Sequence, residues 1–135
     1  KQNPSSPYGA KFSVPYCIAV GLIDGQAGLE QFTEARLQDS SLINLASKVT
    51  YEINPTDEYP KNYTGDITIF KKNGTTISAN QSCLRGGKRS PLGVEEIYRK
   101  FEANLKFANV KSEKIKELRS KIDTIFNMKN LNEII

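Results

Sequence analysis

The stretch AKFSVPYCIAVGLIDGQAGLEQF, residues 10–32, decides how this chain folds. Its segment VPYCIAVGLI, residues 14–23, has no charged side chain and no polar face, which a helix at a protein surface would need. Ser13 is placed to cap the first turn of a helix, and the Asp24-Gly25 pair supplies a stop. The pattern predicts a helix that is buried in a core or in an interface.

A lysine and a tyrosine lie beside the start of this helix. The first backbone N–H groups of a helix have no partner within it, and the helix dipole makes that end positive. Lys11 and Tyr16 are therefore candidates for binding an anion. The alternative is a core helix in which the tyrosine packs and the stem of the lysine lies along the surface. The residues alone leave both alternatives open.

The remaining segments alternate between helical and extended patterns. Further helices are expected at 29–36, 40–48, 94–107 and from about 112. Strands are expected at 49–53, 63–70 and 75–84, the last two joined by a hairpin turn at Asn73-Gly74. The order predicts an α+β fold: an antiparallel three-stranded meander flanked by helices, with helices before and after the sheet. We expect a single domain over 1–135, closed by a short tail at 131–135.

Histidine is absent from the 135 residues. Because histidine is the commonest general base and metal ligand near neutral pH, this chain alone cannot build a Ser-His or Cys-His catalytic pair. A base would have to be a lysine, tyrosine or carboxylate whose pKa is shifted by burial and a partner. If the chain takes part in catalysis, we expect it to supply part of a site rather than the whole.

The two cysteines are Cys17, in the predicted buried helix, and Cys83, in a predicted strand. This placement favours two buried free thiols over a disulfide framework. Carboxylates are scattered over the predicted helix faces, and no cluster of Cys or His exists, so no metal is expected. No cofactor is expected either, since Gly86-Gly87 does not form a nucleotide-binding pattern after a strand.

The chain carries a net charge of +4, and its compact basic run without acids is LRGGKRSPLG, residues 84–93. The glycines predict a loop with open backbone, so Arg85, Lys88 and Arg89 could hold a phosphate or a carboxylate. The same pattern is typical of a mobile surface turn. A nucleic-acid partner is not expected, because the aromatic residues available to stack on bases lie far from this run in the sequence: Tyr8, Tyr59 and Tyr63.

The first residues, KQNPSSPYG, lack the charged-then-apolar pattern of a leader, and no apolar run has the length of a bilayer span. We therefore expect a soluble, cytoplasmic protein with no membrane partner.

The order of these elements resembles the second, smaller domain of the MmgE/PrpD family. Members of this family are lyases of the 2-methylcitrate dehydratase and cis-aconitate decarboxylase kind. The resemblance covers about residues 8–108 and rests on four matches: the Phe-Ser-x-x-Tyr helix with its terminal Asp-Gly in residues 10–32, the strand LASKVTYEI at 45–53, the hairpin DITIFKKNGTTISA at 66–79, and RGGKRSPLGVEEIYRKF at 85–101.

This resemblance implies part of a two-domain carbon-oxygen or carbon-carbon lyase that acts on a small di- or tricarboxylate. The chain would be the lid-like C-terminal domain, and the catalytic histidines would lie mainly in an all-helical domain outside it. Tyr16 is then the catalytic position, and Lys11, Arg85, Lys88 and Arg89 are candidates for binding the substrate. The parent enzyme is expected to be a homodimer, and the chain alone to be inactive. The alternative is a packing or oligomerisation module without a ligand.

Overall fold

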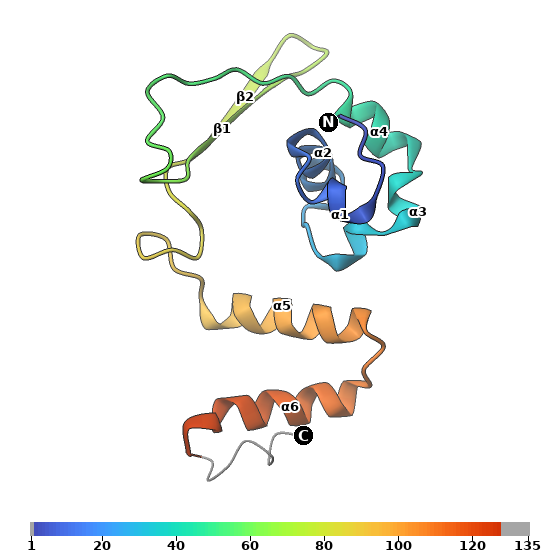
Figure 1. Ribbon diagram of the computed structural model, residues 1–135, viewed down its shortest axis with the longest axis vertical. Helices are drawn as coiled ribbons and strands as arrows, with labels where there is room; N and C mark the ends of the chain where they lie inside the picture. Colours follow the sequence, from blue (N-terminus) through green and yellow to red (C-terminus); the bar gives the residue numbers. More distant parts are fainter. Residues whose placement is uncertain (1, 128–135) are drawn as a thin grey trace. The chain divides into compact units, whose positions relative to one another are not determined.

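The computed structural model describes residues 2–127 of the chain. The chain divides into two compact units, one made of residues 1–51 and 98–135 and the other of residues 52–97. Six α-helices and one two-stranded sheet occur in the described residues: α1 Pro7–Ala10, α2 Val14–Asp24, α3 Glu34–Leu37, α4 Ser40–Ala46, β1 Gly65–Phe70, β2 Thr76–Gln81, α5 Val94–Phe107 and α6 Ser112–Asp123 (Figure 1). Two 3₁₀ turns, η1 Leu29–Phe32 and η2 Ile125–Asn127, complete them. The expected tail at 131–135 lies outside the described residues.

Helix α2 begins and ends where its sequence signals predict. The Ser13 hydroxyl accepts a hydrogen bond from the Tyr16 N–H at 3.3 Å, which satisfies one of the unpaired donors of the first turn. At the other end Gly25 takes a left-handed conformation, with φ of 69°, and its N–H donates to the Gly21 carbonyl at 3.1 Å. The predicted cap and stop are both confirmed.

The core of the chain buries one side of α2, and burial of its other side in an interface stays a prediction. Tyr16, Ala19 and Val20 are at most 1% exposed, whereas Val14 is 62% and Leu22 47% exposed. Apolar residues at a surface are common in folded proteins, so a helix that is apolar all round need not be buried all round.

The core of the first unit lies between α2 and α4, which pack against each other. Leu42 on α4 is completely buried, and burial of such a side chain is worth about 2 kcal/mol. Three alanines with no exposed surface line the same cluster, namely Ala10, Ala19 and Ala46. Small side chains at these positions allow the helices to approach closely, so the core is tight although it contains few large residues.

Two expected helices differ in detail from the structure. The helix expected at 29–36 is divided at Thr33, whose extended backbone ends η1 and whose hydroxyl caps α3 by accepting from the Arg36 N–H at 3.4 Å. Helix α4 ends at Ala46, two residues before the expected end at 48, and its N-cap is Asp39, whose carboxylate accepts from the Ser41 N–H at 2.9 Å.

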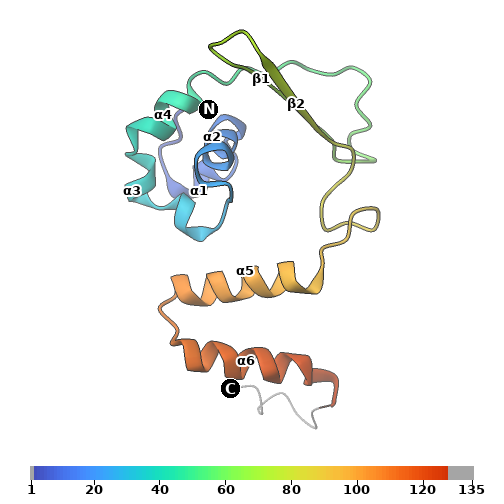
Figure 2. The same ribbon diagram turned by 180° about the vertical axis from the view of Figure 1, so that it is seen from behind.

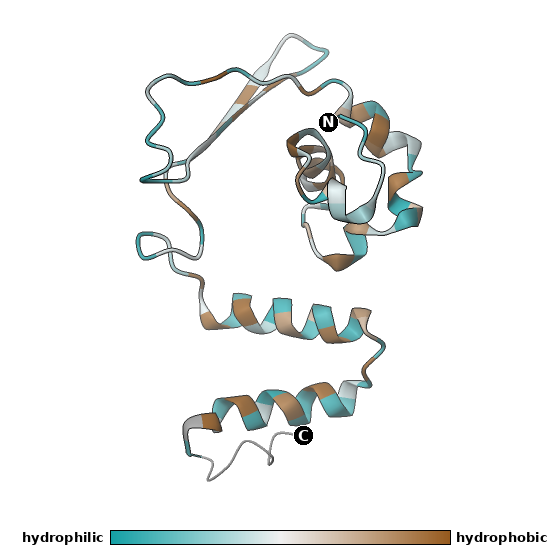
Figure 3. Ribbon diagram, viewed as in Figure 1, coloured by the Kyte–Doolittle hydropathy of each residue, from teal (hydrophilic) through white to brown (hydrophobic). Residues whose placement is uncertain are grey.

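Helices α5 and α6 form an antiparallel pair, and both have alternating apolar and polar residues along them (Figures 1, 2 and 3). Asn109, with φ of 59°, turns the chain between them, and the Val110 N–H donates to the Leu105 carbonyl at 3.0 Å in a Schellman cap. The Arg119 guanidinium of α6 lies 3.9 Å from the ring centre of Tyr98 and also pairs with Glu102 of α5 at 3.2 Å.

In the second unit β1 and β2 form a hairpin. The Lys71 N–H donates to the Thr75 carbonyl at 2.8 Å, and Gly74 has φ of 82°, so the predicted hairpin turn is confirmed. Ile67 lies opposite Ala79 and Ile69 opposite Ile77, which places these four side chains on one face. The other face carries mostly hydroxyl and amide groups, with Thr68 and Ser78 3.1 Å apart.

The prediction of a three-stranded meander is wrong, because in the described residues the sheet consists of β1 and β2 alone. The segment 49–53, expected to be the first strand, is irregular, and Tyr51 and Ile53 on it are 84% and 85% exposed. Its alternation VTYEI is that of a strand, but a strand also needs a neighbour that accepts its backbone hydrogen bonds. The α+β class and the helices before and after the sheet are confirmed.

Cys17 and Cys83 are free thiols, and both are half-buried rather than buried. Over residues 2–127, no helix combines the length and the apolar character that crossing a membrane requires.

Gly21 within α2 and Gly25 directly after it provide a paired test of the helix geometry. A methyl group at Gly21 would meet no atom within 4 Å, so Gly21→Ala should stabilise the protein by about 0.5–1 kcal/mol through higher helix propensity. Gly25→Ala should destabilise it by about 1 kcal/mol, because alanine is strained at a φ of 69°. Urea unfolding of both variants measures the difference. Equal effects of the two substitutions would contradict the assigned end of α2.

Candidate functional site

The junction of α1 and α2 carries Lys11 and Tyr16, the two site residues predicted beside the buried helix. Ser6 caps α1, Ser13 caps α2, and Lys11 lies between them as the C-cap residue that follows α1. The Lys11 side chain is exposed, and no ion pair involves it in the part of the chain that the structure describes. Its ammonium group is therefore available to an anion at this end of α2.

Tyr16 is 1% exposed, and its hydroxyl donates a hydrogen bond of 2.9 Å to the backbone carbonyl of Gln31. Its ring lies 5.9 Å from that of Phe32, centre to centre. This geometry agrees with the alternative of a core helix, in which the Tyr16 ring packs inside the protein and its hydroxyl bonds to the backbone. A contact with a substrate requires the hydroxyl to become accessible and to change its partner.

Burial raises the pKa of the Tyr16 phenol above its ordinary value, while the positive charge of Arg36 acts in the opposite direction. The carboxylates of Asp39 and Asp24 and the Cys17 thiol add to the rise. The phenol consequently keeps its proton at neutral pH. In any reaction it would act as a hydrogen-bond donor or acid, not as a resident base.

Arg36 is a charged residue that the sequence pattern did not single out. Its Nη2 lies 3.0 and 2.7 Å from the two carboxylate oxygens of Asp24, and its Nη1 pairs with Asp39. Asp24 is the last residue of α2 and Asp39 is the cap of α4, so one guanidinium connects the ends of both core helices. The Asp-Gly stop was the available signal, but a stop signal does not reveal that the aspartate also binds an arginine.

The basic loop lies in the second unit, and its glycine-rich turn closes on itself. The Gly86 N–H donates to the Ser90 carbonyl at 2.6 Å, and the Ser90 N–H donates to the Gly87 carbonyl at 3.0 Å. Gly86 has φ of 87°, which explains a glycine at this position. The turn thus satisfies several of its own backbone groups instead of leaving them open for a ligand.

Two of the three predicted cations of this loop have carboxylate neighbours. Arg85 pairs with Glu96, and Arg89 lies 3.8 Å from Glu58, a weak and largely exposed pair. Lys88 is exposed, and no ion pair of it occurs within residues 2–127. The role of Arg85, Lys88 and Arg89 in binding a substrate remains a prediction, and of the three Lys88 has the least competition from the chain's own carboxylates.

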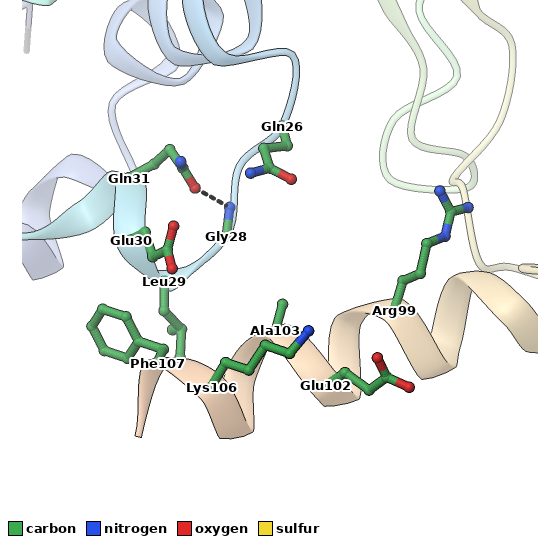
Figure 4. A pocket seen from close by; sticks show the side chains of 10 residues that line it. All are labelled: Gln26, Gly28, Leu29, Glu30, Gln31, Arg99, Glu102, Ala103, Lys106 and Phe107. Carbon is green, nitrogen blue, oxygen red and sulfur yellow. Dashed lines mark hydrogen bonds between the residues drawn. The ribbon is translucent and has the colours of Figure 1, made fainter. Parts of the chain in front are cut away.

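A shallow cavity of about 290 Å³ lies within the first unit, between residues 26–31 and one side of α5 (Figure 4). Arg99 and Lys106 bring positive charge to its lining, and Glu30 and Glu102 bring an equal negative charge. The Gln31 side chain accepts from the Gly28 N–H at 2.9 Å and so shapes one wall. Because the charges balance, this cavity does not select an anion on electrostatic grounds.

Metal binding has no candidate group in the region that the structure describes, since no three His, Cys, Asp or Glu side chains gather there.

Comparison with known proteins places these features in a family. Residues 1–124 match the model of the MmgE/PrpD C-terminal domain. The chain is 31% identical over 103 residues to a cis-aconitate decarboxylase of Mus musculus and 29% identical over 102 residues to one of Homo sapiens. Each alignment covers 75% of this chain and 21% of the relative, so the chain spans about a fifth of the length of these curated relatives. The chain belongs to the MmgE/PrpD family, and the part of the family that it represents is the C-terminal domain.

Proposed function

We propose that this chain is the C-terminal part of a lyase that removes carbon dioxide or water from a small di- or tricarboxylate. The match of residues 1–124 to the MmgE/PrpD C-terminal domain carries the proposal, and the two related decarboxylases favour decarboxylation of cis-aconitate as the first reaction to test. Dehydration of 2-methylcitrate is the second. The proposal includes a cytoplasmic, homodimeric parent enzyme.

In the proposed reaction, this chain and the rest of the enzyme each supply some of the catalytic groups. Elimination beside a carboxylate needs a group that handles the proton on carbon, a donor for the leaving or enolate oxygen, and cations that hold the carboxylates. The chain has no histidine. The proposal assigns the base to a histidine of the helical domain that the family resemblance implies, and to this chain a donor, Tyr16, and a cation, Lys11.

One observation favours the second candidate function, a packing or oligomerisation module. The Tyr16 hydroxyl is already bonded to the Gln31 carbonyl, and two aromatic side chains that precede α2 in the chain, Tyr8 and Phe12, are each 72% exposed. Their rings lie 5.1 Å apart, so they form a small aromatic surface suited to another protein surface. A module of this kind would associate with protein and would not respond to carboxylates.

The two functions are separated by an assay of the complete polypeptide that contains this chain. It is incubated with cis-aconitate, 2-methylcitrate and citrate, and loss of carbon dioxide or water is followed by mass spectrometry. We expect turnover of at least one substrate by the complete polypeptide and none by residues 1–135 alone. A folded complete polypeptide that turns over none of the three contradicts the lyase and leaves the module.

Removal of the Tyr16 hydroxyl tests its role in the reaction. If the phenol donates to the reacting substrate, Tyr16→Phe should lower turnover by about tenfold to a hundredfold. Loss of the 2.9 Å hydrogen bond to Gln31 costs about 1 kcal/mol of stability in either case, so turnover is the decisive measurement. Tyr8→Phe, which removes a hydroxyl from a 72% exposed tyrosine, is the control. Unchanged turnover in Tyr16→Phe restricts the phenol to the core.

Lys11 is tested by the Michaelis constant. If its ammonium group holds a substrate carboxylate, Lys11→Met should raise KM by about tenfold, with a smaller effect on kcat, because a ground-state contact is lost. Lys11→Arg should keep most of the affinity. Lys48→Met removes an exposed lysine of the same unit as a control for net charge. If Lys11→Met and Lys48→Met give the same KM, Lys11 does not bind the substrate.

A further inference from the structure

Arg36 connects the two ends of the segment that holds the Tyr16 hydroxyl. Its guanidinium binds Asp24, the last residue of the helix that carries Tyr16. It belongs to α3, which follows η1, where Gln31 accepts the phenol hydrogen bond. The ion pair between Asp24 and Arg36 therefore closes a loop, residues 24–36, that contains the acceptor Gln31. The donor, Tyr16, lies on α2, the helix that ends at Asp24.

The acceptor is itself held in place. The Gln31 side chain accepts from the Gly28 N–H at 2.9 Å, and Gln31 is 7% exposed. The Asp39 carboxylate, the second partner of Arg36, accepts from the N–H and the hydroxyl of Ser41 at 2.9 and 2.6 Å. The cation thus lies between two carboxylates, and one of them, that of Asp39, is itself held by Ser41.

The burial of these groups makes the contact stronger than an ordinary surface pair. The side chains of Arg36, Asp24 and Asp39 are 27%, 20% and 27% exposed, so water screens them only in part. Arg36 has two carboxylate partners in different elements, which suits the planar fork of arginine and cannot be reproduced by the single ammonium group of lysine. An arginine is therefore required at position 36 for both carboxylate contacts to form together.

We propose that Arg36 is a positioning residue for Tyr16: by tying Asp24 to Asp39 it keeps the η1 turn in register with α2, and so holds the phenol hydroxyl on the Gln31 carbonyl. Its consequence for catalysis rests on the proposed function, in which this hydroxyl becomes the donor to the substrate. The contact itself is a property of the folded chain and can be measured without any substrate. Release of the hydroxyl to a ligand then requires movement of η1 against α2.

The first experiment measures hydrogen exchange of the Tyr16 hydroxyl proton by NMR, relative to the backbone N–H of Val20 in the same core. In the unmodified protein the hydroxyl is buried and bonded, so it should exchange slowly. Arg36→Gln should accelerate exchange of the hydroxyl about tenfold more than that of the Val20 N–H. The effect of Arg36→Lys should lie between those of the unmodified protein and of Arg36→Gln. Lys48→Gln, the matched loss of one positive charge, should leave the ratio unchanged.

The ratio separates positioning from simple stabilisation. A residue that only stabilises the fold would accelerate both protons equally when it is replaced, and that result overturns the proposal. If Arg36→Gln fails to fold, Arg36→Lys and Asp24→Asn, which weaken the same contact more mildly, give the same comparison. Equal acceleration of both protons in these two variants overturns the proposal as well.

The second experiment uses the complete polypeptide and its best carboxylate substrate. Arg36→Lys should lower kcat about tenfold with little change in KM, since the donor and not the binding cation is displaced. A changed exchange ratio in a polypeptide without lyase activity overturns the proposed function and supports the positioning contact. An unchanged ratio in an active enzyme overturns the contact and leaves the proposed function intact.

Discussion

The first unit depends on the contact between α2 and α4. Most of the fully excluded side chains of the described chain meet there, and the buried cluster around this contact combines two leucines, one valine and one tyrosine with alanines from three elements. Because alanines bring the helix backbones close, the space between them admits one aromatic ring, that of Tyr16, and its hydroxyl must find a partner inside. The Gln31 carbonyl supplies that partner, so the hydrogen bond from the Tyr16 hydroxyl fixes the position of the η1 turn against the core.

Local signals predicted the ends of elements well. Ser13 and Gly25 mark the two ends of α2 as expected, and α5 begins at Val94 and ends at Phe107 as its sequence indicates. Such signals work because a cap or a left-handed turn is determined by residues a few positions apart. The segment 49–53 shows the limit, since its alternation describes a strand but no neighbouring strand is present among the described residues to pair with it.

The sequence could name candidate residues of the site, but it could not identify the hydrogen-bond and ion-pair partners of their side chains. Tyr16 was singled out from its place in the helix, yet its contact with Gln31 joins residues 15 positions apart and depends on the turn between them. The same holds for Arg36 and Asp24, which are 12 positions apart. In the basic loop the pattern identified the cations but not Glu96 and Glu58, because the partners of exposed charges are decided by loop conformation.

The hairpin of β1 and β2 has a consequence for handling the protein. Within the described chain each strand has a neighbour on one side only, and the face with Ile67, Ile69, Ile77 and Ala79 leaves Ile77 49% exposed. An unpaired strand edge next to an apolar face is a template for addition of another strand. The positive side chains of Lys71 and Lys72, directly after β1, oppose addition of a second copy in parallel orientation through repulsion, a protection that high salt would weaken. Aggregation at high ionic strength would therefore begin at this hairpin rather than at the alanine-rich core.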